Sequence, residues 1–406
     1  MCMFHLVTKF HFSRSRARAH ALSFSLACLF LMLLLSACGT NTGILHGNGG
    51  WQASGLNAYH FRALAVNGNT PQKVYAGSDQ GAIFTSSDSG DHWTRTRSDI
   101  GHLAAINALG LDTSGKNLYA AADSGLWSSS DGGQHWQELG TGSLPTDTYL
   151  ALAFDLNASN HLYVGTAQHG IYMSKDAGQS WSALTSNWPA GTQVNGLTYA
   201  VDQKQLWAAT STGVYRTQDD GKTWNTFNLG LPTNIPVNVV VPASITGGQS
   251  GLVYVGTQRG FYLSHDNGAH WVQGKDTLAV TPITSIVPDF RSSDSHTLYI
   301  GTGAGTLQSD DEGQTWRAVA NGLPSGHTVY ALAIGGTNNS QLFAALNDIY
   351  LNPGNNQSGS TNILPIILFI AFFVLLYYFA QGKRRRRLIN TIIKREDSQS
   401  PPPPTE

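Results

Sequence analysis

The chain has 406 residues, of which 12% are charged, 41% are hydrophobic and 44 are glycine. The charged share is roughly half the usual one, and this composition favours short strands and tight turns over helices. Thirteen basic and 22 acidic residues lie between Cys38 and Asn362, a net charge of −9 that argues against a nucleic-acid surface.

The first feature along the chain is an apolar run at residues 21–36, which follows a basic flank and ends in Leu35-Ser-Ala-Cys38. This arrangement resembles a bacterial lipoprotein signal. The resemblance implies that residues 1–38 are the signal, that Cys38 receives the lipid and that residues 39–50 are a tether. An ordinary signal peptide or an uncleaved anchor is the alternative.

Metal and cofactor sites are not expected. The three cysteines are Cys2, Cys28 and Cys38, so the rest of the chain has no thiol for a disulfide or a zinc site. The histidines show no metal-ligand spacing, and no phosphate-binding glycine loop or nucleophile elbow is present. We therefore predict no metal and no cofactor.

A strand core of the form aliphatic-aromatic-aliphatic-small recurs about every 44 residues, a period typical of propellers and solenoids. The cores are Val74-Tyr-Ala-Gly77, Leu118-Tyr-Ala-Ala121, Leu162-Tyr-Val-Gly165, Leu206-Trp-Ala-Ala209, Val253-Tyr-Val-Gly256, Leu298-Tyr-Ile-Gly301 and Leu342-Phe-Ala-Ala345. Each of the first six precedes a glycine that supplies the positive φ of a tight hairpin. These glycines are Gly81, Gly125, Gly170, Gly213, Gly260 and Gly305. Seven cores predict seven blades.

Each of the first six cores is also followed by a box of Ser or Thr, Asp, Gly and Trp at one fixed spacing. The boxes are Ser86, Asp88, Gly90 and Trp93; Ser129, Asp131, Gly133 and Trp136; Ser174, Asp176, Gly178 and Trp181; Thr217, Asp219, Gly221 and Trp224; Ser264, Asp266, Gly268 and Trp271; and Ser309, Asp311, Gly313 and Trp316. In such a box the carboxylate accepts backbone N–H bonds across its own turn, Gly takes the left-handed position, and Trp covers the turn. We interpret the boxes as structural rather than as metal or sugar sites.

The seventh repeat has no box and ends at Ile349-Tyr-Leu-Asn352. The stretch Trp51-Gln-Ala-Ser-Gly-Leu56 is similar to Trp316–Leu323, so it can supply the missing outer strand, with Trp51 in the place of a box tryptophan. Closure of this kind removes the open edge of the ring. The predicted fold is an all-β, seven-bladed propeller over residues 51–351, closed by the N-terminal strand.

A second apolar segment, residues 363–380, would span roughly 27 Å as a helix, enough for a bilayer core. The cluster Lys383–Arg387 follows it, and such a cluster marks the cytoplasmic side of a span. We predict a linker at 352–362, one C-terminal transmembrane α-helix, and a basic, proline-ending cytoplasmic tail at 381–406. The propeller would then lie outside the cell membrane. A buried helix is the alternative.

The boxes and the aromatic strands before them resemble the Asp-box, or bacterial neuraminidase, repeat superfamily over about residues 51–351. This superfamily includes sialidases, xyloglucan-cleaving glycosidases, sortilin-type receptors and the photosystem II assembly and stability factor family. The resemblance implies a ring of WD40-like blades, whereas function differs among members because it lies in loops grafted on the ring. The photosystem relatives are lipid-anchored, seven-bladed binders of membrane-protein segments.

An exo-acting glycoside hydrolase of sialidase-like architecture is the alternative function. A sialidase needs three convergent arginines, but only Arg62 lies on a predicted inner strand, and Phe61-Arg-Ala-Leu64 departs from the Arg-Ile-Pro pattern of sialidases. The aspartates that could form a catalytic pair all end an inner strand at one repeat position: Asp112, Asp155, Asp202 and Asp289. Repetition at one position is typical of a turn residue. We therefore favour a protein without catalytic residues.

Loops with proline lead from blade to blade: Ser143-Leu-Pro145, Asn187-Trp-Pro189, Gly230-Leu-Pro232 and Gly322-Leu-Pro324. With Tyr149, Trp188 and Tyr330 near them, these loops could hold a peptide, a sugar or a protein loop, or the aromatics could be core packing. We predict a monomeric, membrane-anchored, extracytoplasmic binding or assembly module for a protein or glycan partner in the cell envelope.

Overall fold

The computed structural model describes residues 50–96, 100, 104–243, 251–274, 278, 280–289, 297–319, 321–335 and 341–353. The chain divides into two compact units, Met1–Gly50 and Trp51–Glu406, and of the first unit only Gly50 is described. The predicted lipid site Cys38 and the predicted span 363–380 lie outside the described residues. Within the described part, no helix has the length and apolar character needed to cross a membrane.

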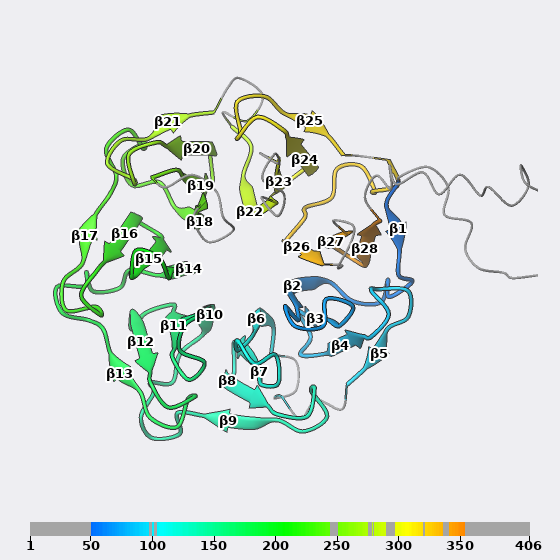
Figure 1. Cartoon of the computed structure of the whole chain (residues 1–406), viewed down its shortest axis with the longest axis horizontal. Coiled ribbons are helices and arrows are strands. Elements are labelled where there is room, and N and C mark those ends of the chain that lie inside the picture. The colour runs from blue at the N-terminus through cyan, green and yellow to red at the C-terminus, as the bar shows by residue number, and fades with distance from the viewer. Residues whose placement is uncertain are drawn as a thin grey trace, which may run out of the picture. The chain divides into compact units, whose positions relative to one another are not determined.

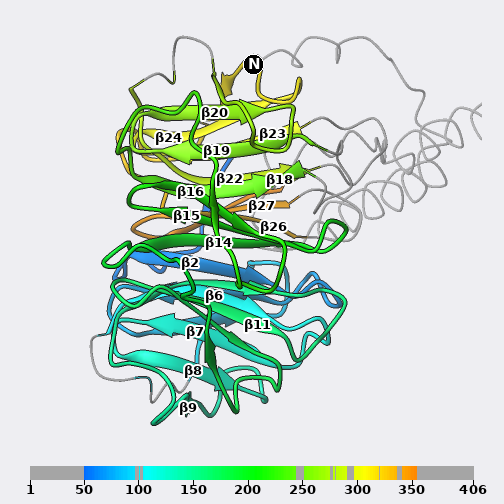
Figure 2. The ribbon, with the colours of Figure 1, turned by 90° about the vertical axis from the view of Figure 1, so that its left-hand side faces the viewer.

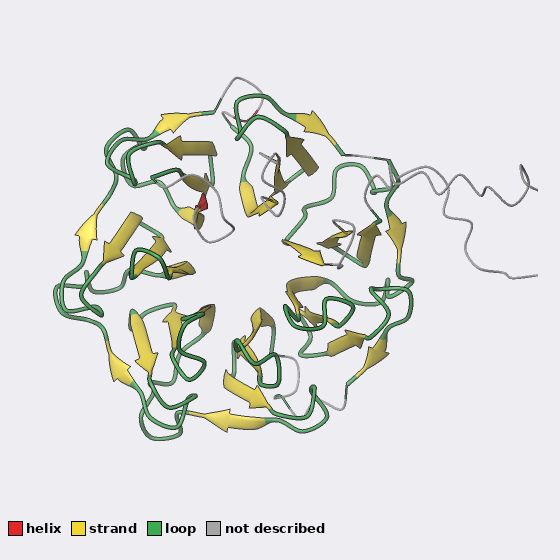
Figure 3. Ribbon diagram, viewed as in Figure 1, coloured by secondary structure: helices red, strands yellow, loops and turns green. Residues whose placement is uncertain are grey.

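Seven antiparallel sheets of four strands each form a ring of blades, so the predicted seven-bladed propeller is confirmed (Figures 1 and 3). The first four blades are β2 (Phe61–Val66), β3 (Val74–Ser78), β4 (Ile83–Ser86), β5 (Thr94–Arg95); β6 (Ile106–Leu111), β7 (Leu118–Ala122), β8 (Gly125–Ser129), β9 (Gln137–Leu139); β10 (Tyr149–Phe154), β11 (Leu162–Thr166), β12 (Ile171–Ser174), β13 (Ser182–Ala183); and β14 (Val194–Ala200), β15 (Gln205–Thr210), β16 (Gly213–Thr217), β17 (Asn225–Thr226). The last three are β18 (Val237–Pro242), β19 (Val253–Thr257), β20 (Gly260–Ser264), β21 (Val272–Gln273); β22 (Ile283–Asp289), β23 (Thr297–Thr302), β24 (Gly305–Ser309), β25 (Arg317–Ala318); and β26 (Ala331–Gly335), β27 (Gln341–Ala345), β28 (Ile349–Asn352) with β1 (Gln52–Ala53).

The N-terminal strand closes the ring. β1 pairs antiparallel with β28, with Gln52 opposite Leu351 and Ala53 opposite Tyr350. Blade 7 is therefore built from both ends of the propeller, as the similarity between the stretch at Trp51 and the stretch at Trp316 predicts. This pairing removes the open edge that β28 would otherwise present.

The strand cores occupy the second strand of each blade, and the aromatic residue of every core except Tyr299, which is half-buried, lies in the interior. Tyr75, Tyr119, Trp207, Tyr254 and Phe343 are all at most 1% exposed. The six hairpin glycines that follow the cores have φ between +76° and +149°, a region that L side chains rarely adopt. The local pattern of the repeat therefore fixes both the buried strand and the turn after it.

Each blade runs from an inner strand near the ring axis to an outer strand at the periphery (Figure 1), and its strands run between the two faces of the ring (Figure 2). Because the strands are antiparallel, the turn between the second and third strands lies at the same end as the loop to the next blade. We call this end the loop face. The turns of the Asp-boxes, which join the third and fourth strands, lie at the opposite end, the box face.

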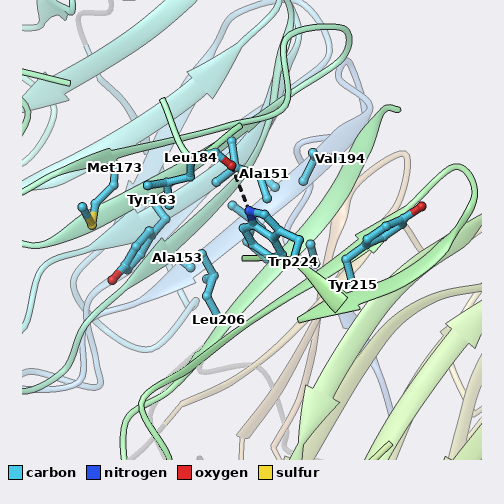
Figure 4. Close-up of a cluster of buried hydrophobic side chains, with 12 residues drawn as sticks. Ala151, Ala153, Tyr163, Met173, Leu184, Val194, Leu206, Tyr215 and Trp224 are labelled. Atoms are coloured by element: carbon cyan, nitrogen blue, oxygen red, sulfur yellow. Dashed lines mark hydrogen bonds between the residues drawn. The ribbon is translucent and has the colours of Figure 1, made fainter. Parts of the chain in front are cut away.

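The core lies between neighbouring blades rather than in one central mass. One cluster combines Tyr163 and Leu184 of blade 3 with Leu206, Tyr215 and Trp224 of blade 4 (Figure 4). Equivalent clusters join the other blades. Each blade is thus stabilised mainly by the apolar surface that it buries against its neighbours.

The tryptophans at the start of the outer strands divide into two groups by the partner of their indole N–H. Four donate to the glycine carbonyl of their own box at 3.0–3.1 Å: Trp93, Trp136, Trp181 and Trp316. Three donate instead to the preceding blade at 2.7–2.8 Å, namely Trp51 to Val319, Trp224 to Leu184 and Trp271 to Phe227. The second group joins blades 6 and 7, 3 and 4, and 4 and 5. These three side chains are only 4–5% exposed.

Candidate functional site

The six Asp-boxes form closed hairpin turns on the box face. In each box the Ser or Thr hydroxyl donates to Oδ1 of the Asp at 2.7–2.8 Å and accepts the N–H of the Gly at 2.8–3.0 Å. The backbone N–H four residues after the Asp also donates to Oδ1. The carboxylates are therefore occupied by their own turns. They are Asp88, Asp131, Asp176, Asp219, Asp266 and Asp311. Among the described residues, no group of three His, Cys, Asp or Glu side chains could hold a metal.

The box glycines differ from the sequence-based expectation, in which each was only the left-handed residue of its own turn. Their φ is between +80° and +94°, but the residue before each glycine is also left-handed, with φ between +58° and +76°. Each glycine also packs on the preceding blade. A Cβ atom added to any of them would lie 2.7–3.1 Å from a side chain there, Leu184 in the case of Gly221. The box glycines are Gly90, Gly133, Gly178, Gly221, Gly268 and Gly313. They are structural residues of the blade boundaries and offer no ligand group.

The second oxygen of each box carboxylate has one of two kinds of partner. In three boxes it pairs with a histidine Nδ1 at 2.6–2.7 Å: His92, His135 and His270. In the others it accepts a hydroxyl from Ser180, Thr223 or Thr315. The hydroxyl and backbone N–H of Thr223 and the hydroxyl of Thr217 lower the pKa of Asp219 to about 2. The corresponding groups of Ser180 lower the pKa of Asp176 to about 2.

These lowered pKa values predict a loss of stability in acid. A carboxylate with a lowered folded-state pKa stabilises the fold above its unfolded pKa of about 4, and this contribution is lost as the pH falls towards 2. We expect the melting temperature to fall over this window. Asp219→Asn should lower the melting temperature at neutral pH and make the acid decline shallower. Thermal melts from pH 7 to pH 2 measure both effects.

The matched control is Asp220→Asn, whose side chain lies outside the box hydrogen bonds and only approaches Lys175 at 3.6 Å across the surface. Asp220→Asn should leave the decline of the melting temperature with falling pH as steep as in the parent chain. Equal slopes for Asp219→Asn and the parent chain would contradict the role of the box.

The aspartates considered as catalytic candidates lie in separate blades. Asp112 accepts hydrogen bonds from Ser114, Lys116 and Asn117 in the turn between β6 and β7. Asp155 accepts the N–H of Asn157 in the corresponding turn of blade 3. Asp202 and Asp289 follow or end the inner strands β14 and β22 and also have interaction partners. In blade 1 the same position is Asn67, which binds the N–H groups of its own turn.

The inner strands carry a feature that the repeat does not reveal, a bulge after their first residue. One residue is left out of the ladder between the first and second strands in six blades: Arg62, Asn107, Leu150, Asn195, Asn238 and Thr284. Tyr330 takes the corresponding place in blade 7, directly before β26. These seven residues, which we call the axial ring, lie at the loop-face ends of the strands nearest the ring axis.

Four members of the axial ring join one blade to the next. Asn107, Asn195 and Asn238 donate through their amides to the carbonyls of Tyr149, Val237 and Ile283 at 2.8–3.1 Å. The hydroxyl of Thr284 donates to the carbonyl of Val329. A polar residue directly after the first apolar residue of an inner strand was the sequence signal for these contacts.

The two exposed members lie on either side of the seam between blades 7 and 1. Arg62 is exposed, and no hydrogen bond or ion pair with a described residue engages its guanidinium. Tyr330 is 44% exposed. The backbone brings them together, since Tyr330 N–H donates to Ala345 and Phe61 N–H donates to the adjacent Leu346.

Two acceptor atoms without partners accompany this pair. Asp79, on the hairpin between β3 and β4, is held to His60 by its backbone N–H at 2.8 Å, and its Oδ1 is buried without a hydrogen bond to the described residues. Asn347, one residue after Leu346, likewise has a buried Oδ1 without a partner in the described part. A free cation and an exposed phenol on one seam, beside two buried acceptors without partners among the described residues, make it the candidate site.

Of the aromatics considered as ligand contacts, only Tyr330 is free at the surface. Tyr149 is 3% exposed and donates its hydroxyl to the carbonyl of Pro145 at 2.5 Å. Trp188 packs on Tyr215 and Trp224 with ring centroids 5.1 and 5.0 Å apart. Both therefore contribute to packing between blades and loops.

An acidic cleft of about 550 Å³ opens on the loop face at blade 2, lined by Asp123, Glu138 and Asp147. Burial raises the pKa of Asp147, but hydrogen bonds from His169, Gln168 and Thr148 outweigh it and hold the pKa below its usual value. Asp147 is thus a charged but fully engaged side chain, and Asp123 and Glu138 are the exposed acids of this cleft.

Comparison with known proteins finds one family model and several solved propellers that are similar to this chain. The family model described as Photosynthesis system II assembly factor YCF48 matches residues 48–196. No curated protein sequence matches the chain. YCF48 from Cyanidioschyzon merolae is 16% identical with a TM-score of 0.59, over 76% of this chain and 99% of that one.

Two further solved structures are similar. The complex of YCF48 bound to D1 peptide is 16% identical with a TM-score of 0.58, over 77% of this chain and 98% of that one. The GH74 xyloglucanase from Xanthomonas campestris is 17% identical with a TM-score of 0.55 over 71% of this chain. This chain spans about half the length of that enzyme, 51%. At such identities the likeness shows the fold alone.

Proposed function

Because the chain is a seven-bladed β-propeller of Asp-box repeats, we propose that it is a binding or assembly module that presents its loop face to a protein partner in the cell envelope. The proposal includes a lipid at Cys38, a membrane span at 363–380, a propeller outside the membrane and a cytoplasmic tail at 381–406. The match to the assembly-factor model and the likeness to a propeller that binds a peptide support it.

The observation that carries the proposal is the seam. Arg62 and Tyr330 are of the residue types that dominate binding energy at protein interfaces. A free guanidinium fits a carboxylate through two parallel hydrogen bonds, and a phenol ring offers apolar area with a polar tip. We infer that the partner contributes an extended segment with an acidic side chain.

We expect a photo-cross-linking residue at position 330 to form an adduct with an envelope protein. The same residue at position 92, on the box face, should not. Arg62→Ala should weaken the adduct about ten- to a hundred-fold, because it removes a central charged anchor. Arg95→Ala, on the outer strand β5, is the matched control and should have no effect. Equal adducts at positions 330 and 92, or an unchanged adduct with Arg62→Ala, would contradict the proposed site.

The acidic cleft at blade 2 and the likeness to the xyloglucanase support a second candidate, a glycoside hydrolase. Glycosidases use two carboxyl groups on either side of the scissile bond, and Asp123 and Glu138 are the exposed acids there. A panel of fluorogenic glycosides with the purified chain separates the two functions. Hydrolysis that Glu138→Gln abolishes would favour the enzyme over the binding module.

A further inference from the structure

The place of a seventh Asp-box is open, and both ends of the propeller leave the ring there. Asn352 is opposite Leu342 of its strand core, the register that a box serine such as Ser309 has in blade 6. Trp51 directly precedes β1 and occupies the position of a box tryptophan. In the other six blades a closed box turn joins these two positions. In blade 7 the chain enters the ring at one of them and leaves it at the other.

Both positions lie on the box face. β28 is the third strand of its blade and β1 is the fourth, and in every other blade these two strands are joined at that face. The predicted tether at 39–50 and the predicted linker at 352–362 are therefore connected to the box face at one point of the ring. The seam of Arg62 and Tyr330 lies on the loop face. Inner strands such as β14 have seven residues, so the two faces are about 20 Å or more apart.

The reach of the two connections limits how the ring can face a membrane. Residues 353–362 are ten residues, which extend over at most about 36 Å. With the box face towards the bilayer, all of this length is available between the ring and the membrane. With the loop face towards the bilayer, each connection would first have to run back along the whole blade, which uses about 20 Å or more of it. The position of the attachment therefore favours the first orientation.

The charge of the box face determines how closely it can approach lipid. Among the described residues, the turns on this face carry fourteen acids and five lysines, a net charge of −9. Anionic headgroups repel such a surface, but at physiological salt the repulsion falls off over about 8 Å. Connections that reach up to about 36 Å can hold the ring beyond that range. The box face therefore faces the bilayer across a layer of water. The acids are Asp88, Asp91, Asp112, Asp131, Asp155, Asp176, Asp202, Asp219, Asp220, Asp266, Asp289, Asp310, Asp311 and Glu312, and the lysines are Lys73, Lys116, Lys175, Lys204 and Lys222.

We propose that the propeller is held with its box face towards the membrane and its loop face away from it. The proposal rests on the anchors at Cys38 and 363–380 that belong to the proposed function, and it defines the partner more closely. The seam of Arg62 and Tyr330 is at least about 20 Å above the bilayer in this orientation. It therefore takes an acidic segment of an envelope protein that projects beyond the membrane surface, and a segment lying on that surface is out of its reach.

The test measures energy transfer from a dye on the propeller to an acceptor dye in the lipid. The full-length chain is placed in vesicles of phosphatidylcholine and phosphatidylglycerol, with the donor on an azide-bearing amino acid at one of three exposed positions. Gln218 lies on the box face of blade 4, across the ring from blade 7, and Thr212 lies on the loop face of the same blade (Figure 1). Ser87 is the equivalent of Gln218 in blade 1, beside the attachment. We expect similar transfer from positions 87 and 218, and a transfer rate at least about two-fold lower from position 212.

A matched variant lengthens both connections without changing the surface of the ring. An insertion of about 20 residues before Gly50 and another after Pro353 is long enough for the ring to turn over. Positions 212 and 218 should then give similar transfer. If the difference between them kept its full size in this variant, the attachment on the box face would not be its cause, and the argument from reach would fail.

Two results with the parent chain would overturn the orientation. The highest transfer from position 212 would mean that the loop face is next to the bilayer. High transfer from position 87, with low and equal transfer from positions 212 and 218, would mean that the ring is held edge-on at blade 7. Release of the chain from the vesicles at high pH would overturn the anchors and this orientation with them. An absent cross-link at position 330 would contradict the seam alone, so the two failures are distinguishable.

Discussion

Replacing Gly322 by alanine is expected to destabilise the propeller by about 3 kcal/mol or more. The backbone at this position has φ +91°, which a residue with a Cβ atom adopts at a cost of about 1–2 kcal/mol. The new Cβ would also lie 2.2 Å from the carbonyl oxygen of Trp51. This backbone belongs to the segment that closes the ring and cannot move away without weakening the pairing of β1 with β28. Denaturant unfolding followed by tryptophan fluorescence measures the loss.

Substitutions at two other glycines distinguish the cost of the steric clash from the cost of backbone strain. Gly326 lies in the same loop with φ +73°, and a Cβ atom there would meet nothing within 4 Å, so Gly326→Ala should cost only about 1–2 kcal/mol. A Cβ atom added to Gly230 would lie 2.2 Å from the carbonyl oxygen of Trp271 at the boundary between blades 4 and 5, so Gly230→Ala should resemble Gly322→Ala. Equal losses for Gly322→Ala and Gly326→Ala would show that the contact with Trp51 contributes nothing.

The second large effect is expected from Asp348→Ala, with a loss of about 3 kcal/mol. Asp348 is 3% exposed, and its carboxylate accepts hydrogen bonds from the hydroxyl of Ser54 and the N–H groups of Gly55, Leu56 and Ile349 at 2.5–3.0 Å. Alanine would leave these donors without partners and release the segment after β1. Hydrogen exchange at the amides of Gly55 and Leu56 should accelerate together with the fall in stability.

The control for Asp348 is Asp123→Ala. Asp123 also lies on the hairpin after a second strand, but it is exposed and accepts one side-chain hydrogen bond, from Asn107 at 2.8 Å. Its replacement should cost less than about 1 kcal/mol. If the two substitutions lowered the free energy of unfolding equally, the hydrogen bonds of Asp348 would not specifically stabilise the segment after β1.

The ring was predictable because the sequence motifs that specify it are short and recur in successive repeats. A hairpin glycine such as Gly213 lies four residues after its strand core, and the spacing of a box such as that of Asp219 can be recognised within one eight-residue stretch. Closure was also predictable, since Trp51 is followed by the same kind of sequence as Trp316. The predicted anchors at Cys38 and 363–380 stay predictions, because they lie outside the described residues.

The candidate site was less predictable because it depends on contacts between repeats. Arg62 stood out in the sequence as an inner-strand arginine, but its neighbours Asp79, Tyr330 and Asn347 belong to three different hairpins or loops that only the closed ring brings together. The two tryptophan groups show the same limit. Trp181 and Trp224 occupy equivalent places in boxes of the same pattern, yet Trp181 donates to its own box and Trp224 donates to Leu184 of the blade before it.

The pairing of Gln52 with Leu351 also determines when blade 7 can form during synthesis of the chain. The strand that completes blade 7 is synthesised first, and its partner is synthesised some 300 residues later, so the nascent chain must keep β1 unpaired while six blades form. Contacts so distant in sequence form slowly, because the loop between them must first become compact. Until β28 is synthesised, the nascent chain forms an open arc of blades with two exposed strand edges. Exposed strand edges can pair with strands of other chains. The open edges of the growing ring therefore persist until β28 has been synthesised and can pair with β1.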